Sequence, residues 1–306
     1  MSDRDAGGAA PLRIEACAAS VSAWPKLRGR TCRVVVVALA LTSGRIYADD
    51  ARTAFRPCID PANMPFANAN GDGFENRIAD LFAKKLALPV QSYASPQRMN
   101  FIRNTLRYKL PGEDFRCDVV MGVPAGYDQV WATVPYYRST YALVYPKGKG
   151  LDQVRSGIDL FALPLDRRSK LRIGIPDKSP ASVWLVKHGM EEQAHPYQMR
   201  SPDPDQYPGE IIEKELAQGK IDAAIVWGPI AGYYAKRVRN VELVVVPLKS
   251  ESGVKFDYEI TMGVRYGERE WKETVDKLIT DNRPAITAIL REYSVPLVDE
   301  RGEPID

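Results

Sequence analysis

The stretch Cys117-Asp-Val-Val-Met-Gly122 decides the fold class, because short and largely apolar runs of this kind form strands buried within parallel sheets. An equivalent run, Ile221-Asp-Ala-Ala-Ile-Val-Trp227, follows about 100 residues later. Upstream, residues 55–59 are predicted to form a strand. A helix opens at Asp72 or Gly73, where apolar residues begin to recur at helical spacing. Strands that alternate with helices predict an open α/β sheet.

The same alternation starts again after residue 140, which predicts two α/β lobes. Further strands are expected at 90–93, 140–145, 171–175 and 241–246, and helices at 99–110, 180–188, 211–218 and 271–293. We expect one lobe to comprise 49–140 and 249–306, and the other 141–248. Because ligands bind beyond the carboxyl ends of strands in such sheets, two facing sheets predict a cleft between the lobes.

The first 48 residues have the layout of a secretory signal peptide. A basic stretch at 26–33 precedes an apolar run at 34–41, and small residues follow as far as Ala48. The apolar run is much shorter than the roughly 20 residues that cross a bilayer as a helix. We therefore expect cleavage between Ala48 and Asp49, export, and no membrane span. The segment before Lys26 is long for a signal peptide, which is consistent with a start codon assigned too far upstream.

Charge and cysteine content narrow the function classes. Without the seven basic and three acidic residues of 1–48, the totals of 42 and 39 fall to 35 and 36, so the mature chain is nearly neutral. Such a balance gives no electrostatic footprint for nucleic acid. Two cysteines, Cys58 and Cys117, remain after the leader. In an exported chain they are expected to form a disulfide, which requires the first and third strands to be neighbours, and two buried thiols are the alternative.

Several segments resemble the type II periplasmic solute-binding proteins of the amino-acid class, namely Pro135-Tyr-Tyr-Arg-Ser-Thr140 and Gly219-Lys-Ile-Asp-Ala-Ala224. A more specific set resembles the MoxJ/XoxJ group, and its closer relatives are on the XoxJ side. This set comprises Cys58-Ile-Asp-Pro-Ala-Asn-Met-Pro-Phe66, Gly73-Phe-Glu-Asn76, Phe101-Ile-Arg-Asn-Thr-Leu106, Cys117-Asp-Val-Val-Met-Gly-Val-Pro124 and Trp227-Gly-Pro229. The resemblance extends from about Phe55 to Leu297. It implies a bilobal type II fold with a two-strand hinge, a periplasmic location and a monomer.

The MoxJ/XoxJ group is encoded beside PQQ-dependent methanol dehydrogenases and their cytochrome partner. The resemblance therefore implies an accessory protein that assists assembly or activation of such a dehydrogenase, on the XoxJ side a lanthanide-dependent one. Amino-acid receptors of the superfamily use an Arg before the hinge strand and an Asp after the second-lobe strand. Here those places have Pro124-Ala-Gly-Tyr-Asp-Gln-Val130 and Trp227-Gly-Pro229. Because an unpaired buried charge costs several kcal/mol, uptake of a standard amino acid is not expected. The alternative function is a transport receptor for another small solute.

Residues that combine aromatic faces with a few polar groups are predicted to line the cleft, where they would suit a planar or apolar guest or a partner's segment. The candidates are Asp60, Asn63, Phe66, Tyr127, Tyr136, Tyr137, Arg138, Ser179, Trp227 and Tyr233. Purely structural roles remain open for five of them. Tyr136 and Tyr137 would pack the hinge, Arg138 would pair with an acid across it, Ser179 would cap a helix, and Trp227 would cover the second core. For Ser179 the functional alternative is binding of an anion at the helix start.

Metal, cofactor and enzyme signatures are weak or missing. Asn68-Ala-Asn-Gly-Asp-Gly73 partly fits a calcium loop, but its twelfth position is Ala79 where a bidentate Glu is required. The two histidines, His188 and His195, have no metal-ligand spacing and no nucleophile motif beside them. We therefore expect no cofactor, no metal and no enzyme. A hydrolase built on the same scaffold is a third class, and it lacks a recognisable catalytic dyad.

Overall fold

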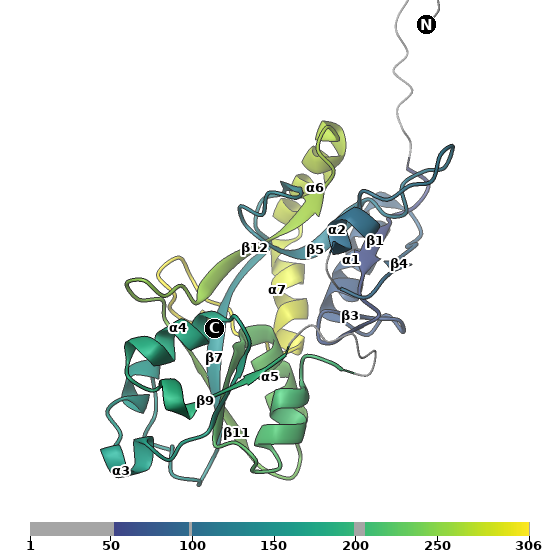
Figure 1. Cartoon of the computed structure of the whole chain (residues 1–306). Coiled ribbons are helices and arrows are strands. Elements are labelled where there is room, and N and C mark those ends of the chain that lie inside the picture. Colours follow the sequence, from purple (N-terminus) through teal and green to yellow (C-terminus); the bar gives the residue numbers. More distant parts are fainter. Residues whose placement is uncertain (1–51, 98–99, 199–205, 306) are drawn as a thin grey trace, which may run out of the picture. The chain divides into compact units, whose positions relative to one another are not determined.

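The computed structural model of the chain describes residues 52–97, 100–198 and 206–305, so the predicted leader lies outside the described residues. The described part is a mixed α/β structure (Figure 1). None of its helices is both long and apolar enough to cross a membrane.

The first α/β unit is built on the strand order β4-β1-β5-β12, in which β1 runs parallel to both β4 and β5 and β12 runs antiparallel to β5. Its strands are β1 (Pro57–Ile59), β2 (Ala62–Asn63), β3 (Ala67–Asn68), β4 (Tyr93–Ala94), β5 (Val119–Pro124), β6 (Trp131–Ala132) and β12 (Asp257–Val264). Its helices are α1 (Phe74–Leu86), α2 (Phe101–Asn104), α6 (Arg269–Asp281) and α7 (Arg283–Glu292). Helix α1 begins after Gly73, as predicted, and it buries Phe74, Ile78 and Phe82 in a core shared with α6 and α7.

A disulfide joins Cys58 and Cys117, as the pairing of the first and third strands predicted. The two Cα atoms are 5.3 Å apart, because Cys58 lies in β1 and Cys117 lies two residues before the neighbouring parallel strand β5. The bridge therefore fastens the two strands whose carboxyl ends carry much of the candidate site.

The second α/β unit repeats the plan with the order β7-β10-β8-β9, in which β10, β8 and β9 are parallel to one another and β7 is antiparallel to β10. Its strands are β7 (Tyr137–Pro146), β8 (Ile173–Pro176), β9 (Ala194–Tyr197), β10 (Ala223–Trp227) and β11 (Leu243–Pro247). Its helices are η1 (Gly157–Leu160), α3 (Leu165–Arg168), α4 (Pro180–Lys187), η2 (Glu191–Gln193), η3 (Ile211–Leu216) and α5 (Gly228–Arg237). Two separate hydrophobic cores cover the faces of this sheet.

Strand β7 is shared by the two units, and its pairing changes partner at Thr140 and Tyr141. Residues 137–140 pair with β12, whereas residues 141–146 pair with β10, β11 or both (Figure 1). The ladders are thus linked through one strand, while each unit keeps its own core. This is the bilobal α/β fold with a hinge. The expected lobe boundaries at 140 and 249 stay a proposal.

Three secondary-structure predictions are wrong in extent. The expected helix at 271–293 is two helices that meet at Asn282, because Pro284 has no N–H to donate and its ring obstructs a continuous helix. Helix α2 spans Phe101–Asn104, far less than the expected 99–110. The strand expected at 90–93 begins only at Tyr93, and Val90 contributes a single bridge to Phe55.

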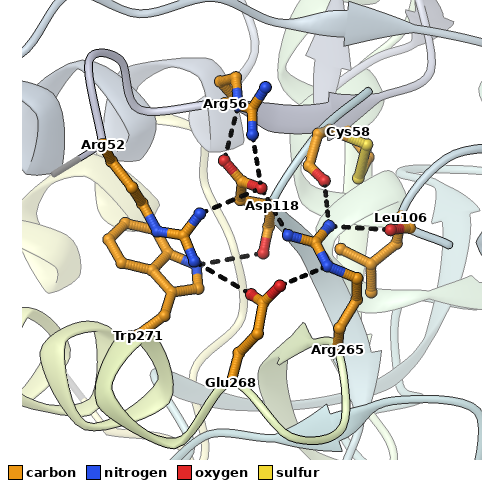
Figure 2. Close-up of polar contacts among 9 residues, drawn as sticks. Arg52, Arg56, Cys58, Leu106, Asp118, Arg265, Glu268 and Trp271 are labelled. Carbon is orange, nitrogen blue, oxygen red and sulfur yellow. Dashed lines mark hydrogen bonds and ion pairs between the residues drawn. A yellow bond between two sulfur atoms is a disulfide. The ribbon is translucent and has the colours of Figure 1, made fainter. Parts of the chain in front are cut away.

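A buried ion cluster lies at the start of β5, at the end of the strand opposite Pro124 (Figure 2). The Asp118 carboxylate accepts two hydrogen bonds from Arg56, at 2.7 and 3.0 Å, and one from Arg265 at 2.6 Å. Arg52 and Glu268 complete the cluster. Burial alone would raise the pKa of Asp118, but the hydrogen bonds from the arginines lower it below its ordinary value. The cluster fastens the beginning of the described chain to the first unit.

Candidate functional site

A pocket of about 850 Å3, the central pocket, lies at the carboxyl ends of parallel strands from both units. Asp60 follows β1, residues 177–179 follow β8, Trp227 ends β10, and residues 120–122 of β5 also line it. In open α/β sheets this is where ligands bind. The volume is within the range of small-molecule sites.

Aromatic side chains form much of the pocket wall. They are Phe66, Phe101, Tyr137, Tyr141, Tyr207 and Trp227. The ring centroids of Tyr141 and Trp227 are 5.4 Å apart with the planes at 66°, and those of Trp227 and Tyr258 are 5.9 Å apart. Rings fixed in this way offer apolar faces with polar edges, which suits a planar or partly apolar guest.

The charged side chains of the pocket are mostly acidic. The described lining residues include three acids, Asp60, Glu75 and Asp177, and one base, Lys178. Asp60 already accepts hydrogen bonds from the backbone N–H of Ala62, at 3.0 Å, and of Gln97, at 2.7 Å. Its carboxylate therefore holds the loop after β1 in place.

Glu75 is a buried carboxyl in the floor of the central pocket. It lies in the first turn of α1 and is 8% exposed. Its Oε1 accepts a hydrogen bond from the Tyr136 hydroxyl at 3.5 Å, and that hydroxyl accepts one from the Gly122 N–H at 3.1 Å. Burial raises the pKa of Glu75 to about 8, because the hydrogen bond from Tyr136 offsets only part of the lost hydration.

Ser179 lies on the other side of the pocket, at the start of α4. It occupies the N-cap position and Pro180 follows in the first turn, as the sequence predicts for a helix start. Its hydroxyl, however, makes no capping hydrogen bond, and it is a buried side-chain oxygen without a hydrogen-bond partner in the described structure. A buried hydroxyl without a partner costs free energy, which a guest with a polar group would recover.

Six of the predicted site residues line the central pocket together. They are Asp60, Asn63, Phe66, Tyr137, Ser179 and Trp227. Glu75 and Tyr141 line the same pocket and were not among the residues predicted from the sequence. For Glu75 a signal was present, because it is spaced three, four and seven residues from Ile78, Ala79 and Phe82 on the buried face of α1.

Four predicted site residues lie outside the central pocket lining. Tyr127 follows the end of β5 and is exposed. Tyr136 is buried behind Glu75. Arg138 pairs with Asp257 at 2.6 Å and Glu259 at 2.9 Å across the β7–β12 ladder, which is the structural alternative that the sequence left open. Tyr233 stacks on Tyr293 with centroids 5.9 Å apart.

The remaining predictions on metals and histidines concern other parts of the fold. Within the described ranges, no group of three or more His, Cys, Asp or Glu side chains is arranged to hold a metal ion. The Asn68 loop is a turn in which the Asn68 side chain accepts a hydrogen bond from the Asp72 N–H at 2.8 Å. His188 stacks on Phe161, with ring centroids 3.9 Å apart, and contacts Glu251.

Comparison with known proteins gives consistent relatives, although no protein-family model matches the chain. The chain is 35% identical to the periplasmic binding protein XoxJ of Methylobacterium extorquens AM1, with a TM-score of 0.65, covering 81% of this chain and 100% of that one. It is 28% identical to Protein MoxJ of Paracoccus denitrificans over 288 residues, which are 88% of this chain and 97% of the relative. An ancestral cationic amino acid solute-binding protein, 19% identical with a TM-score of 0.60, shares the fold over 79% of this chain and 96% of its own. From the full-length match to XoxJ and the two linked α/β units, the chain belongs to the MoxJ/XoxJ-like group of type II periplasmic binding proteins.

Proposed function

We propose that the chain is a non-catalytic accessory protein of methanol oxidation that binds a PQQ-dependent methanol dehydrogenase and assists its assembly or activation. The observation that carries this proposal is the 35% identity to XoxJ over the whole length of that protein. The choice of a dehydrogenase as the partner rests on the MoxJ/XoxJ resemblance, since that group is encoded beside such enzymes. A lanthanide-dependent enzyme is the expected partner.

The lining of the central pocket supports a role other than amino-acid uptake. A free amino acid presents a carboxylate and an ammonium group, and receptors of this superfamily meet the carboxylate with an Arg. Among the described lining residues the base is Lys178, which is exposed, and the Asp60 oxygens are occupied by backbone amides. An unpaired carboxylate in such a pocket would lose hydration without adequate compensation.

The direct test is binding of the purified mature chain to the cognate dehydrogenase in its apo and holo forms, followed by surface plasmon resonance and size-exclusion chromatography. We expect a complex with at least one form. Two variants locate the contact: Trp227→Ala alters the pocket, and Val186→Glu adds a charge to the outer face of α4, where Val186 is 60% exposed. Loss of binding in only one variant identifies the surface. Absence of binding by the unaltered chain to either form contradicts the proposal.

We further propose that the chain works in the periplasm as a cleaved monomer. The leader pattern and the location stated for XoxJ support this, and the disulfide between Cys58 and Cys117 fits an oxidising compartment. Mass spectrometry of periplasmic material is expected to find a chain beginning at Asp49, and light scattering the mass of one copy. A chain retained in the cytoplasm, or one that keeps residues 1–48, contradicts this part.

A second candidate function is a transport receptor for a small solute other than a standard amino acid. It is favoured by the unpartnered Ser179 hydroxyl in a pocket of about 850 Å3. A thermal-shift screen separates the candidates, since a ligand at 100 times its Kd adds about 2.7 kcal/mol to the free energy of unfolding. A strong hit with a single metabolite, together with no binding to the dehydrogenase, would favour the receptor.

A further inference from the structure

Glu75 is the buried one among the acidic side chains that line the described part of the central pocket. Asp60 spends both carboxylate oxygens on the backbone, and Asp177 has other interactions within the protein. The Glu75 carboxyl accepts one hydrogen bond from the described residues, the long one of 3.5 Å from the Tyr136 hydroxyl to Oε1. Its second oxygen has no partner among the described residues. A buried carboxyl in this situation is either kept neutral or paired with an incoming cation.

The groups around Glu75 restrict what such a cation can be. Tyr137 at the start of β7 and the preceding Tyr136 lie beside it, and burial together with the nearby carboxyl raises the pKa of both phenols, which keeps them neutral. From β5, Gly122 is so close that a Cβ there would lie 2.7 Å from Oε1. The other charged groups lining the pocket are Asp60, Asp177 and Lys178. Glu75 itself lines the pocket, so a cation bound there could reach its carboxyl.

Charge and aromatic content agree on the class of guest. Asp60 and Asp177 outnumber Lys178 among the described lining residues even while Glu75 is protonated, so the charge of the pocket favours a cation over an anion. The rings of Tyr137, Tyr141 and Trp227 add faces on which a guanidinium or an aromatic body can stack.

From this geometry we infer that the central pocket binds a small organic cation, a guanidinium or ammonium group on an apolar body, whose charge pairs with Glu75 and releases the Glu75 proton. The step is an exchange: the carboxyl O–H bond breaks, the proton goes to solvent, and the guest's N–H groups replace it as donors to the carboxylate. The inference is independent of dehydrogenase binding, since it concerns a guest in the pocket and not the partner. The pKa of about 8 supports it, because Glu75 then carries its proton at neutral pH before the guest arrives.

The test uses benzylguanidinium, which stays charged from pH 6 to pH 9, with benzylurea as its neutral analogue. Isothermal titration calorimetry on the mature chain, in buffers of different ionisation enthalpy, measures both Kd and the protons released. With a free pKa near 8, Glu75 is about 1% ionised at pH 6 and about 90% at pH 9, so the Kd should tighten roughly 90-fold. About 0.9 protons should be released per guest at pH 7, and benzylurea should bind weakly without proton release.

Two variants complete the experiment. Glu75→Gln is nearly isosteric with the protonated carboxyl, so the variant should fold, bind benzylguanidinium weakly and show neither pH dependence nor proton release. Asp166→Asn removes an exposed carboxylate of α3 outside the pocket and should bind like the parent. The inference is overturned if benzylguanidinium does not bind at pH 9, if benzylurea binds equally well, or if Glu75→Gln keeps the proton release. Each of these results leaves dehydrogenase binding open to its own test.

Discussion

Replacing Glu75 by Gln should change how the free energy of unfolding depends on pH. The native state keeps the Glu75 proton up to a pKa of about 8, whereas the unfolded chain loses it near 4.5. Between these values the native state binds more protons than the unfolded state, so Glu75 makes the protein less stable as pH rises. Each pH unit in this window removes about 1.4 kcal/mol, which approaches roughly 5 kcal/mol by pH 9.

Glutamine keeps the shape and carries no charge at any pH, so the variant avoids this loss. We expect parent and variant to differ little at pH 5, and the variant to be more stable by up to about 5 kcal/mol at pH 9. Urea unfolding of both chains at pH 5, 6, 7, 8 and 9, followed by circular dichroism, gives the difference directly. Other titrating groups cancel, because they are shared by the two chains. The amide oxygen of Gln can still accept the hydrogen bond from Tyr136, so any change in the strength of that bond adds only an offset that does not vary with pH.

Asp166→Asn is the matched control, since it removes a carboxylate from the exposed surface of α3. A difference between parent and Glu75→Gln that stays flat from pH 5 to pH 9 would refute the reasoning, because the native carboxyl would then titrate as it does in the unfolded chain.

Three further changes test the fold around the site by urea unfolding at pH 7. Asp118→Asn should cost about 3 kcal/mol or more, because it leaves buried arginine charge without its main partner; a cost below 1 kcal/mol would contradict this. Replacing Cys58 and Cys117 together by Ala opens a loop with a sequence separation of 59 and should cost roughly 4 kcal/mol, whereas unchanged stability would argue against the bridge. Gly122→Ala should cost about 1–2 kcal/mol, since its φ is 71° and the new Cβ would crowd the Glu75 carboxyl; a neutral effect would show that the carboxyl can move.

The parts of the fold that follow from local pattern could be predicted from the sequence. The run around Val119 and Val120 is almost entirely apolar, which predicts a strand buried within a sheet. Both residues are buried in β5, as this pattern indicates. Cysteines beside two such strands then gave a test of which strands are neighbours, and the bridge between Cys58 and Cys117 met it. In these cases short-range chemistry and long-range topology agree.

The elements that were missed depend on partners far away in the sequence. Strand β12 (Asp257–Val264) was not predicted, although apolar residues alternate along it from Tyr258 to Val264, and its pairing with β5, β6 and β7 could not be read from that pattern. Its Asp257 and Glu259 form ion pairs with Arg138. Because these partners are about 120 residues away in the sequence, Arg138 was predicted to line the cleft. The break at Asn282 had a visible cause in Pro284, two residues on, but the apolar periodicity on both sides concealed it.

The candidate site shows most clearly where sequence reasoning ends. Acidic residues are common in the first turn of a helix because they interact favourably with its dipole, so Glu75 resembles an ordinary solvated residue. Its periodicity with Ile78 and Phe82 indicates burial, but not what buries it. Gly122 of β5 and Tyr136, which directly precedes β7, contribute to this burial, although they lie 47 and 61 residues away in the sequence. The order of the strands in the sheet therefore explains why Glu75 is buried in a pocket and holds its proton, although its sequence position resembles that of a surface acid. The same sheet order places Tyr137, Tyr141 and Trp227 in the pocket that Glu75 lines, so a cation held by these rings would lie near the carboxyl and its binding should be coupled to the titration of Glu75.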